Sequence, residues 1–367
     1  MKKCPHAEEC SGCSLWGTEY SQQIEIKTAR LANHATELGY EGPIHCHELG
    51  GIGIRDRADM QWRLNEGWGF LNKDFKKLKV VDHCPLFSEE LQTLYQWWSR
   101  FKLNAAKASV RLRVSSEGQW GVWLDMANIE VKSLLLEDEL LSQWTHRAHV
   151  EVGQRFKVLK KINDHWKLVD PELRSWFSTC DLQGQSFSLF GSIGSFSQAG
   201  HRINHLLVKS VLQQIKQRSL SSVVELGAGA GNFTLAMAAE GFKVKALEQS
   251  NRALEGLQQS IELYPHLAHQ IDFTVGNFQK LNWGDWAKTK SLLFLDPPRS
   301  GVGENLLRQI PQGDFPSIMY VACGLEAWCV DGKSLRELGY SLKALDWVDQ
   351  FPNTPLYEIV SFWEKIQ

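Results

Sequence analysis

Four of the eight cysteines are spaced like the ligands of a metal centre. Cys4, Cys10 and Cys13 are separated by five and then two residues, and Cys84, which precedes a proline, follows about seventy residues later. Clustered cysteines in a reducing compartment indicate metal binding rather than disulfides. Four thiolates suit zinc or an iron–sulfur cluster, and the spacing is not that of paired zinc knuckles. The other cysteines are interpreted as core or incidental residues, apart from Cys323.

A glycine-rich stretch, ELGAGAGNF at residues 225–233, indicates a ligand site between a strand and a helix. Glycines let the backbone approach a ligand closely, but this pattern alone would also fit a dinucleotide. Glu248 ends the next expected strand, where a carboxylate can accept both hydroxyls of a ribose. The acid before the glycines, Glu225, would attract a sulfonium and repel a pyrophosphate. The stretch therefore favours S-adenosylmethionine over NAD.

Three residues with reactive side chains follow in the C-terminal half. Asp296 begins the sequence DPPRSG after an apolar run, Cys323 ends another apolar run, and Glu358 precedes a third. Taken alone, a cysteine at a strand end could equally be a small core residue, and a glutamate is usually solvated. Enzymes that methylate exocyclic amines carry an aromatic residue after the two prolines, and here Arg299 takes that place, which argues against amine methylation.

These stretches together resemble the RNA uracil-C5-methyltransferase family. Its members carry DPPR-x-G, then Tyr-Val-x-Cys, then Phe-Pro-x-Thr-x-x-x-Glu, and this chain has all three in that order. The resemblance is specific from residue 223 onward and weak over residues 90–190. It also includes Phe196-Ser197-Gln198 and, further back, residues 55–58 and 82–86. Within the family the chain most resembles the compact 23S rRNA enzymes that have an N-terminal 4Fe–4S cluster and no N-terminal TRAM barrel.

The resemblance implies a mechanism and its residues. C5 of uracil is too weak a nucleophile to take a methyl group directly, so Cys323 is expected to add to C6 first. Glu358 is expected to accept the C5 proton, which must leave before Cys323 can depart. Asp296 is expected to contact the base or the cofactor, and Arg299 to pair with a phosphate or orient its loop. The target uridine must be flipped out or lie in a loop.

The resemblance also implies the residues that bind cofactors. The S-adenosylmethionine site is expected to include Gln198, Leu226, Gly227, Gly229, Glu248, Asn277 and Asp296. A 4Fe–4S cluster is expected on Cys4, Cys10, Cys13 and Cys84, with zinc as the alternative.

The chain departs from the family pattern around the base pocket. The usual Cys-Asn-Pro is here Cys323-Gly324-Leu325, the Asn of Phe-x-Gln-x-Asn is Gly200, and the His or similar residue two before the catalytic Glu is Leu356. These changes leave open whether the specificity or the activity is altered. The alternatives to 23S rRNA methylation are therefore a tRNA uridine or another base, or a non-catalytic RNA-binding relative.

The elements that must position these residues indicate two domains. Residues 1–190 are expected to form a mixed, β-rich domain that carries the iron–sulfur cluster and binds RNA. Residues 191–367 are expected to form a doubly wound, Rossmann-like α/β methyltransferase domain with its ligands along the carboxyl edge of the sheet. Its expected strands are 223–226, 244–247, 271–275, 292–295, 317–322 and 359–362.

Bulk properties limit the partners. The net charge is −2, and neither half of the sequence has an excess of Lys and Arg over Asp and Glu. Any RNA-binding groove must therefore be local, with residues 73–79 and 155–161 as candidates. The tryptophans, including Trp62, Trp68, Trp97 and Trp98, could offer stacking platforms, although core packing is the commoner fate. Without a long apolar run or a secretory signal, the expected location is the cytoplasm. No membrane and no obligate protein partner is implied.

Overall fold

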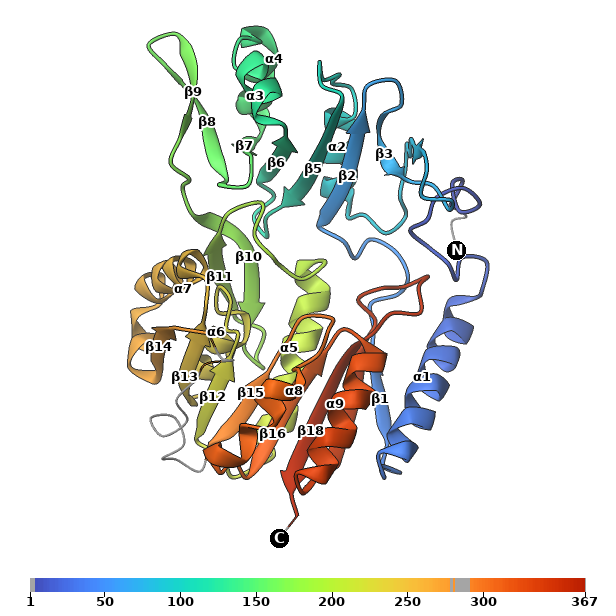
Figure 1. Ribbon diagram of the computed structural model, residues 1–367, viewed down its shortest axis with the longest axis vertical. Helices are drawn as coiled ribbons and strands as arrows, with labels where there is room; N and C mark the ends of the chain where they lie inside the picture. Colours follow the sequence, from blue (N-terminus) through green and yellow to red (C-terminus); the bar gives the residue numbers. More distant parts are fainter. Residues whose placement is uncertain (1–3, 278–279, 281–290, 367) are drawn as a thin grey trace. The chain divides into compact units, whose positions relative to one another are not determined.

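The structure, a computed structural model, describes residues 4–277, 280 and 291–366 and divides the chain into two compact units (Figure 1). The first unit contains residues 1–16, 50–177 and 190–201. The second contains residues 17–49, 178–189 and 202–367. This division differs from the expected boundary at residue 190, because residues 17–49 join the second unit.

The first unit is built on an eight-stranded sheet in which most neighbouring strands are antiparallel; β6 and β7 are parallel. Alternating apolar residues in β2, such as Met60 and Trp62, bury one face of this sheet, as the sequence predicts. The strand order is β4-β3-β2-β5-β6-β7-β8-β9. The bounds are β2 Arg57–Arg63, β3 Gly67–Leu71, β4 Leu78–Lys79, β5 Lys107–Val114, β6 Trp120–Met126, β7 His149–Val152, β8 Lys157–Ile162 and β9 His165–Val169, with helices α2 Glu89–Trp98, α3 Asn128–Leu134 and α4 Asp138–Arg147.

Tryptophans form the core of the first unit. Trp62, Trp68, Trp97 and Trp98 are all less than 9% exposed. The ring centroids of Trp68 and Trp98 are 5.6 Å apart, and those of Trp98 and Trp144 are 4.6 Å apart. These four tryptophans therefore stabilise the unit by packing and are not available as stacking platforms for RNA.

The second unit is a largely parallel, doubly wound α/β sheet, which confirms the expected fold class. Its eight strands run in the order β1-β17-β18-β16-β15-β12-β13-β14, and β18 is antiparallel to both of its neighbours. Short apolar runs form the central strands, since both faces of such a sheet are covered. The bounds are β1 Ile44–His47, β12 Ser222–Leu226, β13 Lys243–Glu248, β14 Ile271–Val275, β15 Leu292–Leu295, β16 Ser317–Ala322, β17 Tyr340–Val348 and β18 Glu358–Lys365.

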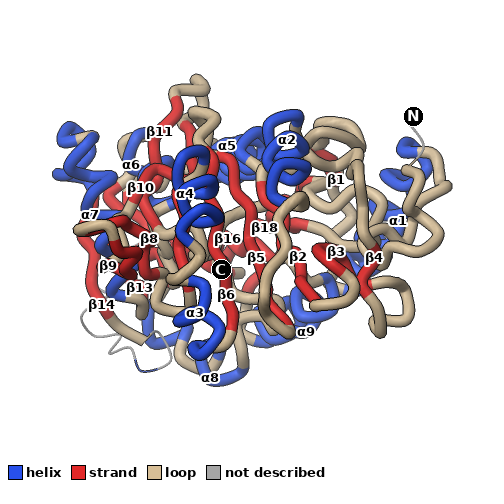
Figure 2. The backbone as a smooth tube through the Cα atoms, turned by 90° about the horizontal axis from the view of Figure 1, so that it is seen from above, coloured by secondary structure: helices blue, strands red, loops and turns tan. Residues whose placement is uncertain are grey.

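Helices cover both faces of this sheet. Figure 2 shows α5 and α9 on opposite sides of β16 and β18. The helices are α1 Tyr20–Glu37, α5 His201–Lys216, α6 Asn232–Ala239, α7 Asn251–Leu263, α8 Glu304–Leu307 and α9 Leu325–Glu337, with 3-10 turns at Pro265–Gln270 and Ile310–Gly313. A separate pair consists of β10 Arg174–Cys180 and β11 Ser186–Gly191, and the division of the chain between the units falls within each of these two strands. Within the described ranges no helix combines the length and apolar character needed to cross a bilayer.

The N-terminal segment of the second unit completes its sheet and one of its helical layers. β1 pairs in parallel with β17, so that Ile44 lies opposite Leu345. Helix α1 lies beside α9, where Arg30 donates to Glu326 over 2.7 Å (Figure 1). Leu31 and Ala35 of α1 belong to the same hydrophobic core as the central strands. Residues 17–49 are therefore a structural part of the α/β unit.

Candidate active site

The carboxyl edge of the second unit's sheet brings together most of the residues predicted to act on a substrate. β18, β16, β15, β12 and β13 are consecutive neighbours in the sheet. The edge carries Glu358 at the start of the antiparallel β18, Cys323 after β16, Asp296 after β15, Gly227 after β12 and Glu248 at the end of β13. Because parallel strands end at a common edge, five separate chain segments meet there.

The strand register makes Cys323 and Glu358 neighbours. Ala322 of β16 lies opposite Ile359 of the antiparallel β18. One step further along each strand, Cys323 therefore faces Glu358. On its other side Glu358 pairs with Val348 of β17, and only 4% of its surface is exposed. A half-buried thiol and a buried carboxyl thus lie side by side in one register of the sheet.

Burial and mutual repulsion favour the protonated forms of these groups. Burial raises the pKa of the Cys323 thiol to about 11, and the carboxylates of Glu358 and Asp296 add to this shift. Burial likewise raises the pKa of Glu358 well above its ordinary value and that of Asp296 to about 7. The exposed Arg299 acts in the opposite direction on Cys323 and Glu358. Such shifts are typical of groups arranged for chemistry.

The glycine-rich turn is anchored by Glu225. This carboxyl is 2% exposed, and one of its oxygens accepts a 2.6 Å hydrogen bond from the Thr234 hydroxyl in α6. Burial raises the pKa of Glu225 to about 8, although the Thr234 hydrogen bond opposes the shift. Glu225 thereby ties β12 to α6 on either side of the turn. Sequence analysis noted the acid before the glycines but not its threonine partner.

Glu248 meets the turn from the neighbouring strand. One carboxylate oxygen accepts the N–H of Gly229 at 2.9 Å, and the other accepts the N–H of Ser250 at 2.8 Å. A carboxylate has about four lone-pair sites, so both oxygens can still accept ribose hydroxyls. Gly227 and Gly229 have φ values of 84° and 57°, in the left-handed region that favours glycine. The left-handed backbone conformation of these two glycines therefore sets the shape of the turn.

The remaining residues predicted to bind the cofactor are Leu226, Asn277 and Gln198. Leu226 is buried at the end of β12, and Asn277 is exposed shortly after β14. Gln198 is 7% exposed and belongs to the first unit, whereas the other residues of the predicted site belong to the second. Its role in cofactor binding stays a prediction.

Two of the departures from the family pattern have steric explanations. A Cβ atom at Gly200 would lie 2.0 Å from the carbonyl oxygen of Ile54, so an Asn cannot fit there with this backbone. A Cβ atom at Gly324 would lie 3.1 Å from the carbonyl oxygen of Arg299. The DPPR loop therefore approaches the backbone after Cys323 more closely than a larger residue would readily permit.

A buried polar cluster supports the loop that leads to Glu358, and sequence analysis did not identify it. Lys27 of α1 donates to Asp349 over 2.7 Å and to the carbonyl of Phe351 over 3.0 Å. Gln23, one turn earlier, exchanges two hydrogen bonds with Asn353, of 2.8 and 3.0 Å. Asn353 has a φ of 62°, so this turn needs such support. The i, i+4 spacing of Gln23 and Lys27 is the one signal in the sequence.

The four cysteines predicted to bind a cluster all belong to the first unit. Burial raises the pKa of Cys13 to about 12, and the nearby thiols of Cys84, Cys10 and Cys4 add to the shift. In the described part of the chain, however, no three or more His, Cys, Asp or Glu side chains are gathered as a set of metal ligands.

The fold and the edge together define a class I S-adenosylmethionine-dependent methyltransferase. A tRNA (uracil-54, C5)-methyltransferase of Pyrococcus abyssi, solved in complex with S-adenosyl-L-homocysteine, has the same fold. Its TM-score is 0.72 at 20% identity, and the similarity covers 96% of this chain and 86% of that one.

Sequence comparison defines the family. The model of the tRNA (uracil-5-)-methyltransferase family matches residues 176–366. An uncharacterised RNA methyltransferase of Bdellovibrio bacteriovorus is 30% identical over 99% of this chain and 95% of its own length. A 23S rRNA (uracil(1939)-C(5))-methyltransferase of Vibrio parahaemolyticus is 25% identical over 99% of this chain and 81% of its own length. A tRNA/tmRNA (uracil-C(5))-methyltransferase of Sulfurovum sp. is 24% identical over 99% of each chain. The chain belongs to this family of S-adenosylmethionine-dependent RNA uracil-C5-methyltransferases.

Proposed function

We propose that the protein transfers a methyl group from S-adenosylmethionine to C5 of a uridine in 23S rRNA, through a covalent adduct of Cys323. The pairing of Cys323 with Glu358 across β16 and β18 carries this proposal. It puts a nucleophile and a proton acceptor beside each other at the edge where the glycine-rich turn would hold the methyl donor.

The chemistry assigns one step to each residue. The Cys323 thiolate forms a bond to C6, and the electron pair of the C5–C6 double bond moves into an enolate. C5 then attacks the methyl group, and the sulfonium leaves as a neutral thioether. Glu358 must be ionised at this point: its carboxylate accepts the C5 proton, the double bond re-forms, and Cys323 leaves as a thiolate. Asp296 contacts the uracil edge or the cofactor, and Arg299 holds a phosphate of the flipped nucleotide or orients the loop.

The cofactor-binding residues form the other half of the proposal. Glu248 accepts hydrogen bonds from the ribose, and the turn at Gly227 and Gly229 lets the backbone approach the donor. Leu226, Asn277, Asp296 and Gln198 line the rest of the site, as the resemblance to the family implies.

An adduct experiment separates the two catalytic residues. Cys323→Ala should abolish methyl transfer, because C5 stays unreactive without addition at C6. Glu358→Gln should still allow addition and methylation but should accumulate a protein–RNA adduct that survives a denaturing gel. RNA with 5-fluorouridine should trap the wild type in the same way, since fluorine cannot leave as a cation. Wild-type activity in Cys323→Ala, or an adduct on Cys329, would refute the mechanism.

The target RNA is identified by mapping 5-methyluridine. Comparison of 23S rRNA and tRNA from cells with and without the protein should show loss of one modified nucleotide in rRNA. Loss in tRNA instead would transfer the proposal to the alternative substrate. Neither turnover nor adduct on any cellular RNA would favour a non-catalytic RNA-binding relative. The cytoplasm is the proposed location because these RNAs are made and used there.

We further infer that Cys4, Cys10, Cys13 and Cys84 hold a 4Fe–4S cluster. Their spacing in the sequence and their common place in the first unit support the inference. The cluster would crosslink the N-terminal segment to the loop that carries Cys84, and we assign it no redox step. Protein purified without oxygen should be brown with about four irons per chain. A colourless protein with one zinc would replace the cluster by the zinc alternative.

A further inference from the structure

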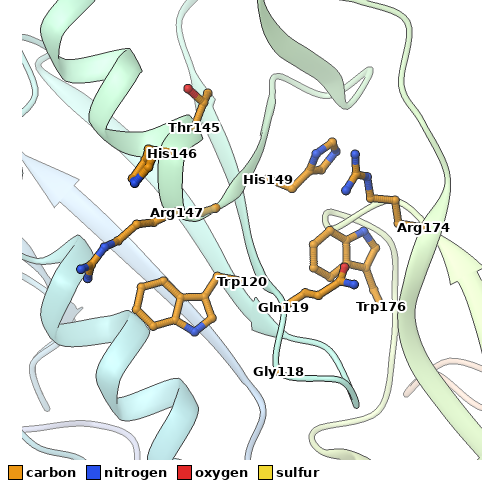
Figure 3. Close-up of a pocket in the computed structure, with 10 residues that line it drawn as sticks. Gly118, Gln119, Trp120, Thr145, His146, Arg147, His149, Arg174 and Trp176 are labelled. Carbon is orange, nitrogen blue, oxygen red and sulfur yellow. The ribbon is translucent and has the colours of Figure 1, made fainter.

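The first unit contains a hollow of about 550 Å³ that the proposed catalytic site does not use. Its walls come from the turn before β6, the end of α4, the start of β7 and β10. Figure 3 shows two ends: Trp120 and Arg147 lie at one, and Gln119, His149, Arg174 and Trp176 gather at the other. The chemistry of these six side chains indicates what the hollow can bind.

The lining is cationic and contains no acid among its ten described residues. Arg147 is exposed, and no carboxylate partner is found for it in the described part of the chain. Arg174 has Glu172 as a partner at 3.1 Å, at a half-exposed site where such a pair is weak. In a chain with a net charge of −2, this lining is a local concentration of positive charge.

Two buried nitrogen atoms in the wall lack partners. Trp176 is 1% exposed, and no described residue accepts a hydrogen bond from its Nε1–H. The Nε2 atom of His149 is also buried without a partner, and the two rings lie 5.9 Å apart. In Figure 3 the indole nitrogen is on the side of its ring that faces Arg174. Buried polar atoms are nearly always hydrogen-bonded, so a ligand with acceptor atoms would satisfy this end.

Trp120 supplies an aromatic surface at the other end. Unlike the core tryptophans it is only half-buried. Its ring packs on the buried Trp97 with centroids 5.5 Å apart, so it is held in place while part of it remains accessible. A fixed, partly exposed indole beside an arginine is the arrangement on which a nucleobase stacks.

We propose that this hollow binds one nucleotide of the RNA substrate, away from the uridine that is methylated. The base stacks on Trp120, its phosphate lies among Arg174, Gln119 and the Trp176 N–H, and Arg147 on the rim meets the next phosphate. The proposal rests on the proposed RNA substrate and adds an anchoring subsite to it. Stacking and phosphate contacts carry little sequence information, so the subsite contributes affinity rather than choice of base.

Two charge changes test the subsite. Arg147→Glu and Arg174→Gln should each weaken binding of a fluorescent oligouridylate about tenfold or more at low salt. Each should also reduce the slope of log K against log salt by about one. Arg100→Glu, an exposed site in the same unit outside the hollow, is the matched control and should change neither. Binding of S-adenosylhomocysteine and the melting temperature should be the same in all four proteins.

Crosslinking and a nucleotide probe complete the test. RNA that contains 4-thiouridine should crosslink to the tryptic peptide with Trp120, and less so in Arg147→Glu. If both variants bind RNA as Arg100→Glu does, the subsite is wrong while methylation by the wild type still upholds the proposed function. Uridine monophosphate that binds as tightly as the oligonucleotide would make the hollow a free-nucleotide site and overturn the proposal. A wild type that binds no RNA would overturn both.

Discussion

Two acidic residues at the sheet edge have pKa values raised into the range where a nearby cationic ligand would displace protons. The pKa values of Glu225 and Asp296 are raised to about 8 and about 7, chiefly by burial. A nearby positive charge favours the ionised form of a carboxyl group. S-adenosylmethionine carries a sulfonium and S-adenosylhomocysteine does not, so the two ligands differ in this respect although their shapes are nearly the same.

This difference predicts proton release. At pH 7, binding of S-adenosylmethionine should release more protons than binding of S-adenosylhomocysteine, because the sulfonium lowers the pKa of these carboxyls through neutral pH. Calorimetric titrations in two buffers with different ionisation enthalpies measure the difference. Glu225→Gln should reduce it. Equal proton release for both ligands would mean that neither acid responds to the sulfonium.

The thiol of Cys323 makes a second residue-scale prediction. With a pKa of about 11, only a small fraction is thiolate at pH 7, and this fraction rises with pH. Trapping by 5-fluorouridine RNA at saturating cofactor should therefore accelerate from pH 6 to pH 9, by up to about tenfold per pH unit. Gel quantification of the adduct over time gives the rate. A rate that is flat over this range would show that the RNA-bound enzyme has already ionised the thiol.

At the scale of elements, helix α1 supports the catalytic edge from a distant part of the chain. The side chains of Lys27 and Asp349 are 1% and 0% exposed, so their opposite charges form a buried ion pair. Tyr357, the residue before Glu358, donates from its hydroxyl to the backbone carbonyl of Lys27 over 3.1 Å. The helix thus contacts the loop 349–357 along most of its length.

Breaking this ion pair should damage the loop. Lys27→Met leaves Asp349 charged and buried and should lower the free energy of unfolding by about 3–5 kcal/mol. The double variant Lys27→Met, Asp349→Asn should recover part of this loss, because no uncompensated charge remains. Arg30→Met, on the same helix in the exposed pair with Glu326, is the control and should cost about 1 kcal/mol or less. Denaturant titrations measure all three, and equal losses for Lys27 and Arg30 would contradict the argument.

The strands that could be predicted from the sequence are those with a pattern within a few consecutive residues. β12, β13, β15 and β16 are short, largely apolar runs that end at a glycine-rich turn or at a polar or reactive residue, and their positions are confirmed. The pairing of β1 with β17 joins residues about three hundred positions apart and leaves no local pattern. Lys27 and Gln23 look like an ordinary solvated helix face until Asp349 and Asn353 are placed against them. The metal-ligand interpretation of the cysteines rests on their spacing in the sequence, because the described residues contain no gathered set of metal ligands.

At the scale of the whole molecule, the order of the segments along the chain differs from their division between the two units. Residues 17–49 precede most of the first unit but provide an edge strand and a helix of the second. A domain boundary at residue 190 would therefore cut the methyltransferase unit. A fragment that begins at residue 191 lacks β1 and α1, and the β17 edge and an apolar face would be uncovered.

Such a fragment should not fold. We expect residues 191–367 to aggregate on expression, whereas the full chain stays monodisperse in size-exclusion chromatography. Restoring residues 17–49 through a flexible linker, together with residues 178–190, should increase the soluble yield and restore a cooperative thermal transition, because it returns the missing segments of the unit. A soluble, cooperatively unfolding fragment of 191–367 would show that β1 and α1 are dispensable.

The position of β18 has a consequence for the protein's synthesis. This strand, Glu358–Lys365, lies between β16 and β17 inside the sheet, yet it follows both of them in the chain and is made after them. Until it is made, β16 and β17 cannot be joined and Cys323 has no Glu358 opposite it. The first unit can fold during translation, as N-terminal domains commonly do. The catalytic edge, in contrast, can close only once β18 has been made, so a chain that stops before Glu358 cannot methylate RNA.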